Sequence, residues 1–198
     1  NLVKKPNFLK HLCNNVQRTL SLINKKKFNS IILNYDERSD NFFKWYQQLI
    51  AESLGKKSKG ILPIISPMPK DNHSLLQFYL DGPRNNFFTF FYIFEKKSNF
   101  FKTGNHYKNF YYLNNKNVSE IQYTQKVATQ NIFNKKKIPF RSFEILKRSE
   151  ETLGELFSFF ILETILLGKA LNVNPFDQPS VELIKNETKR IFIKSNYR

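Results

Sequence analysis

The chain has 198 residues, of which 40% are hydrophobic and 21 are phenylalanine, so it can bury the core of one large domain and is not a disordered chain. Its single cysteine, Cys13, excludes an intrachain disulfide and fits a reducing compartment. The net charge of +16 is typical of nucleic-acid-binding proteins. However, lysine is enriched together with asparagine, isoleucine and phenylalanine, as AT-rich coding produces, and the lysines are scattered.

The chain starts at Asn1 rather than methionine, and no basic stretch followed by an apolar one precedes its first element. We therefore expect a protein without a signal peptide, a cytoplasmic location, and a chain that is the back portion of a longer protein. Lysine clusters at residues 25–27, 56–59 and 135–137 each end a predicted helix or fill a loop. A cation near a helix C-terminus is stabilised by the helix dipole and needs no ligand.

Helical and strand patterns alternate through the first part of the chain. Residues 6–23 carry apolar side chains at helical spacing, and residues 30–33 form a short apolar run typical of a buried parallel strand. A second helical stripe covers residues 40–54 and ends at Gly55, and residues 60–65 predict the next strand.

The helix at residues 40–54 puts Gln48 and Glu52, four residues apart, on one face. Glu52 lies in the last turn, where the negative end of the dipole disfavours a charged carboxylate, a condition that suits a general base. An isolated acidic residue near a helix end is more often a solvated charge. Residues 48–56, QLIAESLGK, resemble the segment that carries the catalytic glutamate in the glucose-6-phosphate isomerase family.

A short helix is predicted at residues 73–79, capped by Asp71 or Asn72. His73 would lie in its first turn, where the positive end of the dipole favours a neutral imidazole that can accept or donate a proton. A capping or packing histidine is the alternative. Residues 70–83, KDNHSLLQFYLDGP, are similar to the stretch that holds the ring-opening histidine in bacterial members of the same family.

The second half continues the alternation. The strand predicted at residues 86–95 is dense in phenylalanine, which favours core and dimer contacts over a base-stacking platform. A poorly patterned loop at residues 98–117 precedes a helix at 118–133 and an alternating strand at 138–146. The strongly apolar helix at 149–171 is interrupted by charges, which indicates a buried central helix and not a membrane span.

Residues 174–185, NPFDQPSVELIK, have the pattern of a helix start, with a helix from residue 178 to about 193. Asp177 can cap the free N–H groups of the first turn, and proline suits that turn. Gln178 and Lys185 are two helical turns apart and therefore share one stripe. The run resembles the C-terminal signature of the same family, although Ser180 stands where that signature favours glycine or alanine.

The three segments occur in the order of the family and, with the helix–strand alternation, imply an α/β fold. The resemblance implies a three-layer αβα sandwich with a mostly parallel sheet, a sugar-isomerase (SIS-type) domain. Residues 1–198 are expected to be the C-terminal domain of a longer isomerase, including C-terminal helices at about 149–193. The family's phosphate-binding Ser/Thr loop and its catalytic arginine have no equivalent in this chain, so the chain alone is not expected to be active.

The resemblance implies reversible isomerisation of glucose 6-phosphate and fructose 6-phosphate through a cis-enediol, a step of glycolysis and gluconeogenesis. Glu52 is then the base that carries the proton between C1 and C2. His73 would assist ring opening from the neighbouring subunit of a homodimer, and Lys185 would contact the ring oxygen or hydroxyls. Gln48 and Gln178 match positions that line the sugar and phosphate. The resemblance implies no metal, cofactor, membrane or nucleic-acid partner.

Two other function classes stay open. A non-catalytic phosphosugar-binding module of the same fold would bind ligand without proton exchange at C2, and the presence of Glu52 argues against it. A basic nucleic-acid-binding domain would bind polyanions with strong salt dependence, and the dispersed lysines argue against it.

Overall fold

The computed structural model describes residues 7–94, 102–104 and 109–195 of the chain. Within these ranges the strands form one sheet in the order β2-β1-β3-β4, and each neighbouring pair is parallel. The strands are β1 (Asn29–Asn34), β2 (Leu62–Pro67), β3 (Asn86–Ile93) and β4 (Phe140–Ile145).

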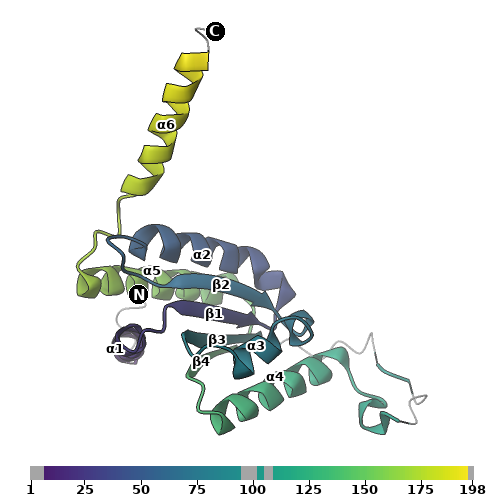
Figure 1. The fold of residues 1–198 in the computed structure, drawn as a ribbon. Helices are drawn as coiled ribbons and strands as arrows, with labels where there is room; N and C mark the ends of the chain where they lie inside the picture. The colour runs from purple at the N-terminus through teal and green to yellow at the C-terminus, as the bar shows by residue number, and fades with distance from the viewer. Residues whose placement is uncertain (1–6, 95–101, 105–108, 196–198) are drawn as a thin grey trace.

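Helices cover both faces of this sheet (Figure 1). One apolar cluster joins the sheet to α1 (Phe8–Asn24), α2 (Asp40–Leu54) and α5 (Glu150–Leu171). A second cluster on the other face joins it to α3 (Leu76–Asp81) and α4 (Val118–Lys135). The predicted three-layer α/β sandwich with a parallel sheet is therefore confirmed. The last helix, α6 (Pro179–Ser195), projects away from these layers.

Strand β3 lies inside the sheet, and every one of its residues is buried. Its side chains alternate in direction: Phe87 and Phe91 face the α1–α2–α5 cluster, whereas Phe88 and Phe90 face α3 and α4. The phenylalanine run is thus the core of the chain and is not a base-stacking platform. The expected contribution of this run to a dimer contact is wrong, because the chain's own helices enclose it.

The predicted boundaries agree with the structure to within two residues for all elements except the helix at 73–79. There the chain forms a 3-10 turn, η3 (Lys70–Asn72), and α3 begins only at Leu76. The expected cap, Asp71, is buried and accepts hydrogen bonds from Ser66 Oγ at 2.6 Å and Ser74 Oγ at 2.8 Å. His73 therefore lies in the turn before α3, and the expectation that a helix N-terminus tunes it is wrong.

Two further 3-10 turns are η2 (Glu37–Ser39) and η4 (Tyr111–Leu113). The turn η4 falls within the predicted loop at 98–117, much of which lies outside the described residues. Helix α5 packs as a central helix against α1 and α2, as predicted. Among the helices of the described ranges, none has the length and apolar character needed to cross a membrane.

A buried ion pair fixes α5 to the sheet. Arg141 Nη1 of β4 lies 2.5 Å from Glu163 Oε1 of α5, with side-chain exposures of 14% and 1%. Arg141 Nε also donates to Thr89 Oγ1 of β3 at 3.0 Å. Burial opposes the charged guanidinium, but the Glu163 carboxylate holds the pKa of Arg141 above its usual value. The sequence showed Glu163 only as a charge that interrupts an apolar helix.

Removing this carboxylate leaves a buried guanidinium without its counter-charge. We expect Glu163→Gln to lower the free energy of unfolding by about 3 kcal/mol or more in urea titrations. The exposed Glu151→Gln on the same helix should cost less than about 1 kcal/mol. A double variant, Arg141→Met with Glu163→Leu, should recover most of the loss; equal losses in Glu163→Gln and Glu151→Gln would show that the pair does not hold α5.

Candidate active site

Two amide side chains converge on the carboxylate of Glu52. Gln48 Nε2, one turn earlier on α2, donates to Glu52 Oε1 at 2.9 Å. Gln178 Nε2, from the linker between α5 and α6, donates to Glu52 Oε2 at 2.6 Å. Three of the predicted site residues are thus brought together. A carboxylate accepts about four hydrogen bonds, so these two orient it and leave it capacity for a substrate.

A cavity of about 210 Å³ adjoins this carboxylate. It is lined by Ala51, Glu52, Gly55, Lys56, Gln178, Pro179, Ser180 and Val181. Ser180, which departs from the family's signature, therefore lines the site itself. In the described part of the chain, no group of three or more His, Cys, Asp or Glu side chains is arranged to hold a metal ion.

The linker that carries Gln178 folds back over the end of α5. Asn172 ends the helix in the left-handed conformation, with φ 54° and ψ 48°. Asn174 Oδ1 then accepts a hydrogen bond from the Phe176 backbone N–H at 3.1 Å. A Cβ at Gly168 would lie 3.1 Å from Pro175 Cβ, so glycine allows the linker to pack this closely.

The loop after α2 holds the linker through lysine side chains. Lys56 Nζ donates to the Asn174 carbonyl at 2.5 Å and lies 2.9 Å from Asp177 Oδ1. Lys59 Nζ donates to the Leu171 carbonyl at 2.8 Å. The hydrogen bond from Lys56 lowers the pKa of Asp177 below its usual value. We call these contacts the Lys56 clamp.

The Lys56 clamp differs from the sequence-based expectations for its residues. The Asp177 carboxylate, expected to cap the last helix, is paired with Lys56. The side chain of Lys56 is only 9% exposed and has two partners in the linker, whereas the sequence indicates a lysine cluster that ends a helix or fills a loop and needs no ligand. Its partners lie 118 and 121 positions further along the chain, so no local sequence pattern indicates the contact. The only signal in the sequence is that Lys56 is the last residue of the segment at residues 48–56 that resembles the isomerase family.

His73 and Lys185 are not brought to Glu52 within the single chain. Glu52 lies just before β2, at the edge where the strands begin, and His73 follows β2 and is exposed. Because β2 has six residues and is about 20 Å long, the two lie at opposite edges of the sheet. Lys185 is on the projecting α6, where its Nζ pairs with Glu182 Oε1 at 2.6 Å.

The chain is similar in sequence to proteins named as glucose-6-phosphate isomerases. It is 36% identical over 161 residues to a probable enzyme of Methanococcus maripaludis, covering 81% of this chain and 36% of that protein. It is 35% identical over 178 residues to that of Mycoplasmopsis pulmonis, covering 87% and 41%. The chain therefore spans about two fifths of the length of the relatives that it matches. No protein-family model matches it.

Two solved structures share the fold. A hypothetical protein of Thermus thermophilus superposes with a TM-score of 0.77 at 23% identity, covering 89% of this chain and 45% of that one. A glucose-6-phosphate isomerase of Chlamydia trachomatis gives a TM-score of 0.67 at 19% identity, covering 85% and 35%. At these identities the likeness concerns the fold alone.

The Lys56 clamp predicts which residues hold Gln178 in place. In Lys56→Gln we expect backbone hydrogen exchange in the peptide covering residues 172–181 to accelerate about tenfold, as the loss of a charge-assisted hydrogen bond implies. Asp177→Asn should accelerate exchange in the same peptide. The exposed Lys57→Gln is the matched control and should leave exchange unchanged; equal exchange in Lys56→Gln and Lys57→Gln would refute the clamp.

Proposed function

We propose that this chain, a relative in sequence of the glucose-6-phosphate isomerases, is the C-terminal sugar-isomerase domain of a cytoplasmic enzyme that interconverts glucose 6-phosphate and fructose 6-phosphate. One structural observation supports the proposal in addition to the sequence similarity. The amides of Gln48 and Gln178 both donate to the carboxylate of Glu52, although Gln178 lies 126 positions from Glu52 along the chain. A solvated surface glutamate has no need of such an arrangement.

In the proposed reaction, Glu52 acts as the base. Its carboxylate takes the proton from C2 of the open-chain aldose, and a cis-enediol forms as O1 gains a proton. The same group then returns its proton to C1 while O2 loses its hydroxyl proton, which gives the ketose. Such a base must lie within hydrogen-bond reach of the carbon-bound proton and keep its orientation. The amides of Gln48 and Gln178 supply that orientation by binding one oxygen each.

Ring opening is assigned to His73 and Lys185. The separation of Glu52 and His73 across the sheet supports a homodimer in which the histidine enters from the neighbouring subunit. Lys185 would contact the ring oxygen or the sugar hydroxyls once α6 is held by other parts of the intact protein. Because the chain spans about two fifths of its relatives, the phosphate-binding groups are assigned to the remainder, and the activity belongs to the intact enzyme.

The lysines give little support to a nucleic-acid function. Lys27 Nζ donates to the Arg84 carbonyl, Lys136 pairs with Asp81, and Lys56 and Lys59 hold the linker. Each predicted lysine cluster thus has side chains engaged within the chain. The experiment below distinguishes an enzyme from a non-catalytic phosphosugar-binding module.

The test uses the full-length natural protein that contains this chain, supplied with fructose 6-phosphate in deuterated water. We expect glucose 6-phosphate labelled at C2, and we expect Glu52→Gln to lower kcat by about three orders of magnitude or more with the sugar phosphate still bound. The exposed Glu151→Gln should keep full activity. Binding without exchange in the unmodified protein would leave only a phosphosugar-binding module, and a fully active Glu52→Gln would exclude Glu52 as the base.

A further inference from the structure

A buried aspartate holds the turn that carries His73. Asp71 lies in η3, shortly after β2, and its side chain is enclosed by the chain. Its Oδ2 accepts a hydrogen bond from Ser66 Oγ of β2 at 2.6 Å, and its Oδ1 accepts one from Ser74 Oγ at 2.8 Å. One carboxylate therefore joins the strand before the turn to the residue that follows His73.

The backbone of this turn is itself hydrogen-bonded. The N–H of His73 donates to the Lys70 carbonyl at 3.3 Å, and the N–H of Leu75 donates to the Asp71 carbonyl at 3.0 Å. The imidazole of His73 is exposed, and within the described part of the chain its side chain has no hydrogen-bond partner. The position of the imidazole therefore depends on the backbone of the turn.

The Asp71 carboxylate lies in a buried environment, where water does not replace a lost hydrogen bond. Ser66 is fully buried in β2, and Tyr79 of α3 is buried beside it. Burial raises the pKa of the Tyr79 hydroxyl, and the nearby Asp71 carboxylate adds to that rise. Removal of this carboxylate would leave the Ser66 hydroxyl without its charged acceptor, which loosens the turn from the strand.

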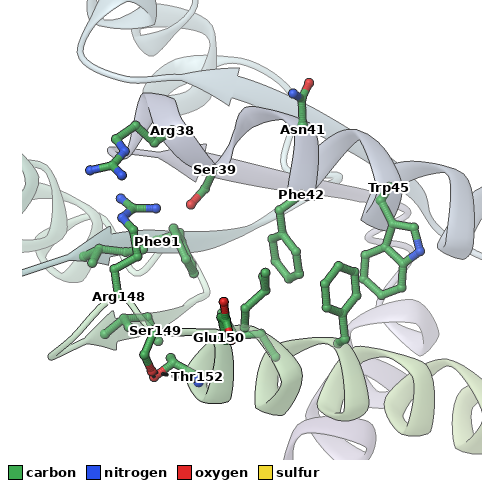
Figure 2. Close-up of a pocket in the computed structure, with 15 residues that line it drawn as sticks. Arg38, Ser39, Asn41, Phe42, Trp45, Phe91, Arg148, Ser149, Glu150 and Thr152 are labelled. Atoms are coloured by element: carbon green, nitrogen blue, oxygen red, sulfur yellow. Dashed lines mark hydrogen bonds between the residues drawn. The ribbon is translucent and has the colours of Figure 1, made fainter.

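The neighbouring strand ends in a turn of the same kind that carries none of the predicted site residues. Asp36, between β1 and η2, accepts hydrogen bonds from Ser39 Oγ and from Arg148 Nη2, the latter at 2.6 Å. Ser39 and Arg148 line a cavity between the first turns of α2 and α5, and Figure 2 shows their side chains beside each other. The chain therefore contains a matched comparison for Asp71.

Ring opening is the step that uses His73 in the proposed reaction. In cyclic fructose 6-phosphate the bond between C2 and the ring oxygen breaks, the ring oxygen gains a proton, and the hydroxyl on C2 loses one. A group that transfers such a proton must lie within hydrogen-bond reach of the oxygen concerned. Because a misplacement of about 1 Å costs up to about a hundredfold in rate, the turn that holds the imidazole matters for this step.

We propose that Asp71 is a positioning residue for ring opening. Through Ser66 and Ser74 it fixes the turn on β2, and so it fixes where His73 enters the site of the neighbouring subunit. This role rests on the proposed function, which assigns ring opening to His73. Proton transfer between C1 and C2 belongs to Glu52 at the opposite edge of the sheet and does not depend on Asp71.

Two sugars separate ring opening from proton transfer in the full-length natural protein. Fructose 6-phosphate is mostly cyclic, whereas 5-deoxyfructose 6-phosphate lacks the hydroxyl that closes the ring and stays open. Both keep C1, C2 and the phosphate, so each should exchange a C1 proton in deuterated water. We expect Asp71→Ala to lower kcat for exchange of fructose 6-phosphate about tenfold or more, and to change exchange of the open analogue less than about twofold.

Further variants distinguish positioning from a general loss of stability. Asp71→Asn keeps the shape of the side chain and can still share hydrogen bonds with both serine hydroxyls, so it should retain most of the activity on fructose 6-phosphate. Asp36→Ala removes the matched carboxylate and should affect both sugars alike. If Asp71→Ala does not fold by circular dichroism, Ser66→Ala replaces it, with an expected loss of about fivefold on fructose 6-phosphate alone and Ser39→Ala as its control.

The outcomes separate this role from the proposed function. Equal losses on both sugars in Asp71→Ala, or unchanged rates on both, would overturn the role of Asp71 and leave the proposed function intact. Exchange of fructose 6-phosphate but not of the open analogue by the unmodified protein would also overturn it, because proton transfer would then depend on contacts at the ring oxygen. Exchange of neither sugar would contradict the proposed function and, with it, the role assigned to Asp71.

Discussion

The candidate active site depends on one contact between distant parts of the chain. The Lys56 ammonium, at the end of α2, binds both the Asn174 carbonyl and the Asp177 carboxylate of the linker before α6. This contact, with the close packing of Pro175 on Gly168, sets where the linker runs. Gln178 follows directly and so reaches the Glu52 carboxylate. Without this contact, Glu52 and Gln48 would form a pair on the surface of one helix.

The parallel sheet imposes a second constraint by separating the functional groups. Every strand runs the same way, so the segments that follow α2 and α5 meet at one edge while those that follow the strands meet at the other. Glu52 and Gln178 belong to the first edge, and His73 belongs to the second. Under the proposed function, a single copy therefore holds only part of the site, which agrees with the proposed dimer. Helix α2 runs from the second edge back to the first, where Glu52 lies near its end.

Much of the fold followed from local patterns, whereas the parts that were missed depend on long-range contacts. Periodicity placed most elements to within two residues, and the spacing of Gln48 and Glu52 placed them on one helix face, where the structure shows them hydrogen-bonded. The start of α3 was wrong because Asp71 binds Ser66 instead of capping a helix at His73. The role of Lys56 could not be predicted, because its partners are more than a hundred residues away. Spacing placed Gln178 on one stripe with Lys185 and the resemblance assigned it to the site, but only the folded linker brings it to Glu52.

The most direct test is the position of a bound sugar. A crystal structure of the full-length protein carrying Glu52→Gln, with fructose 6-phosphate bound, would place the substrate relative to the side chain at position 52. The account predicts C1 and C2 within about 3.5 Å of that side chain, the near-attack distance, with Gln178 beside it and His73 of the neighbouring subunit at the ring oxygen. A sugar bound at the opposite edge of the sheet, away from position 52, would contradict it.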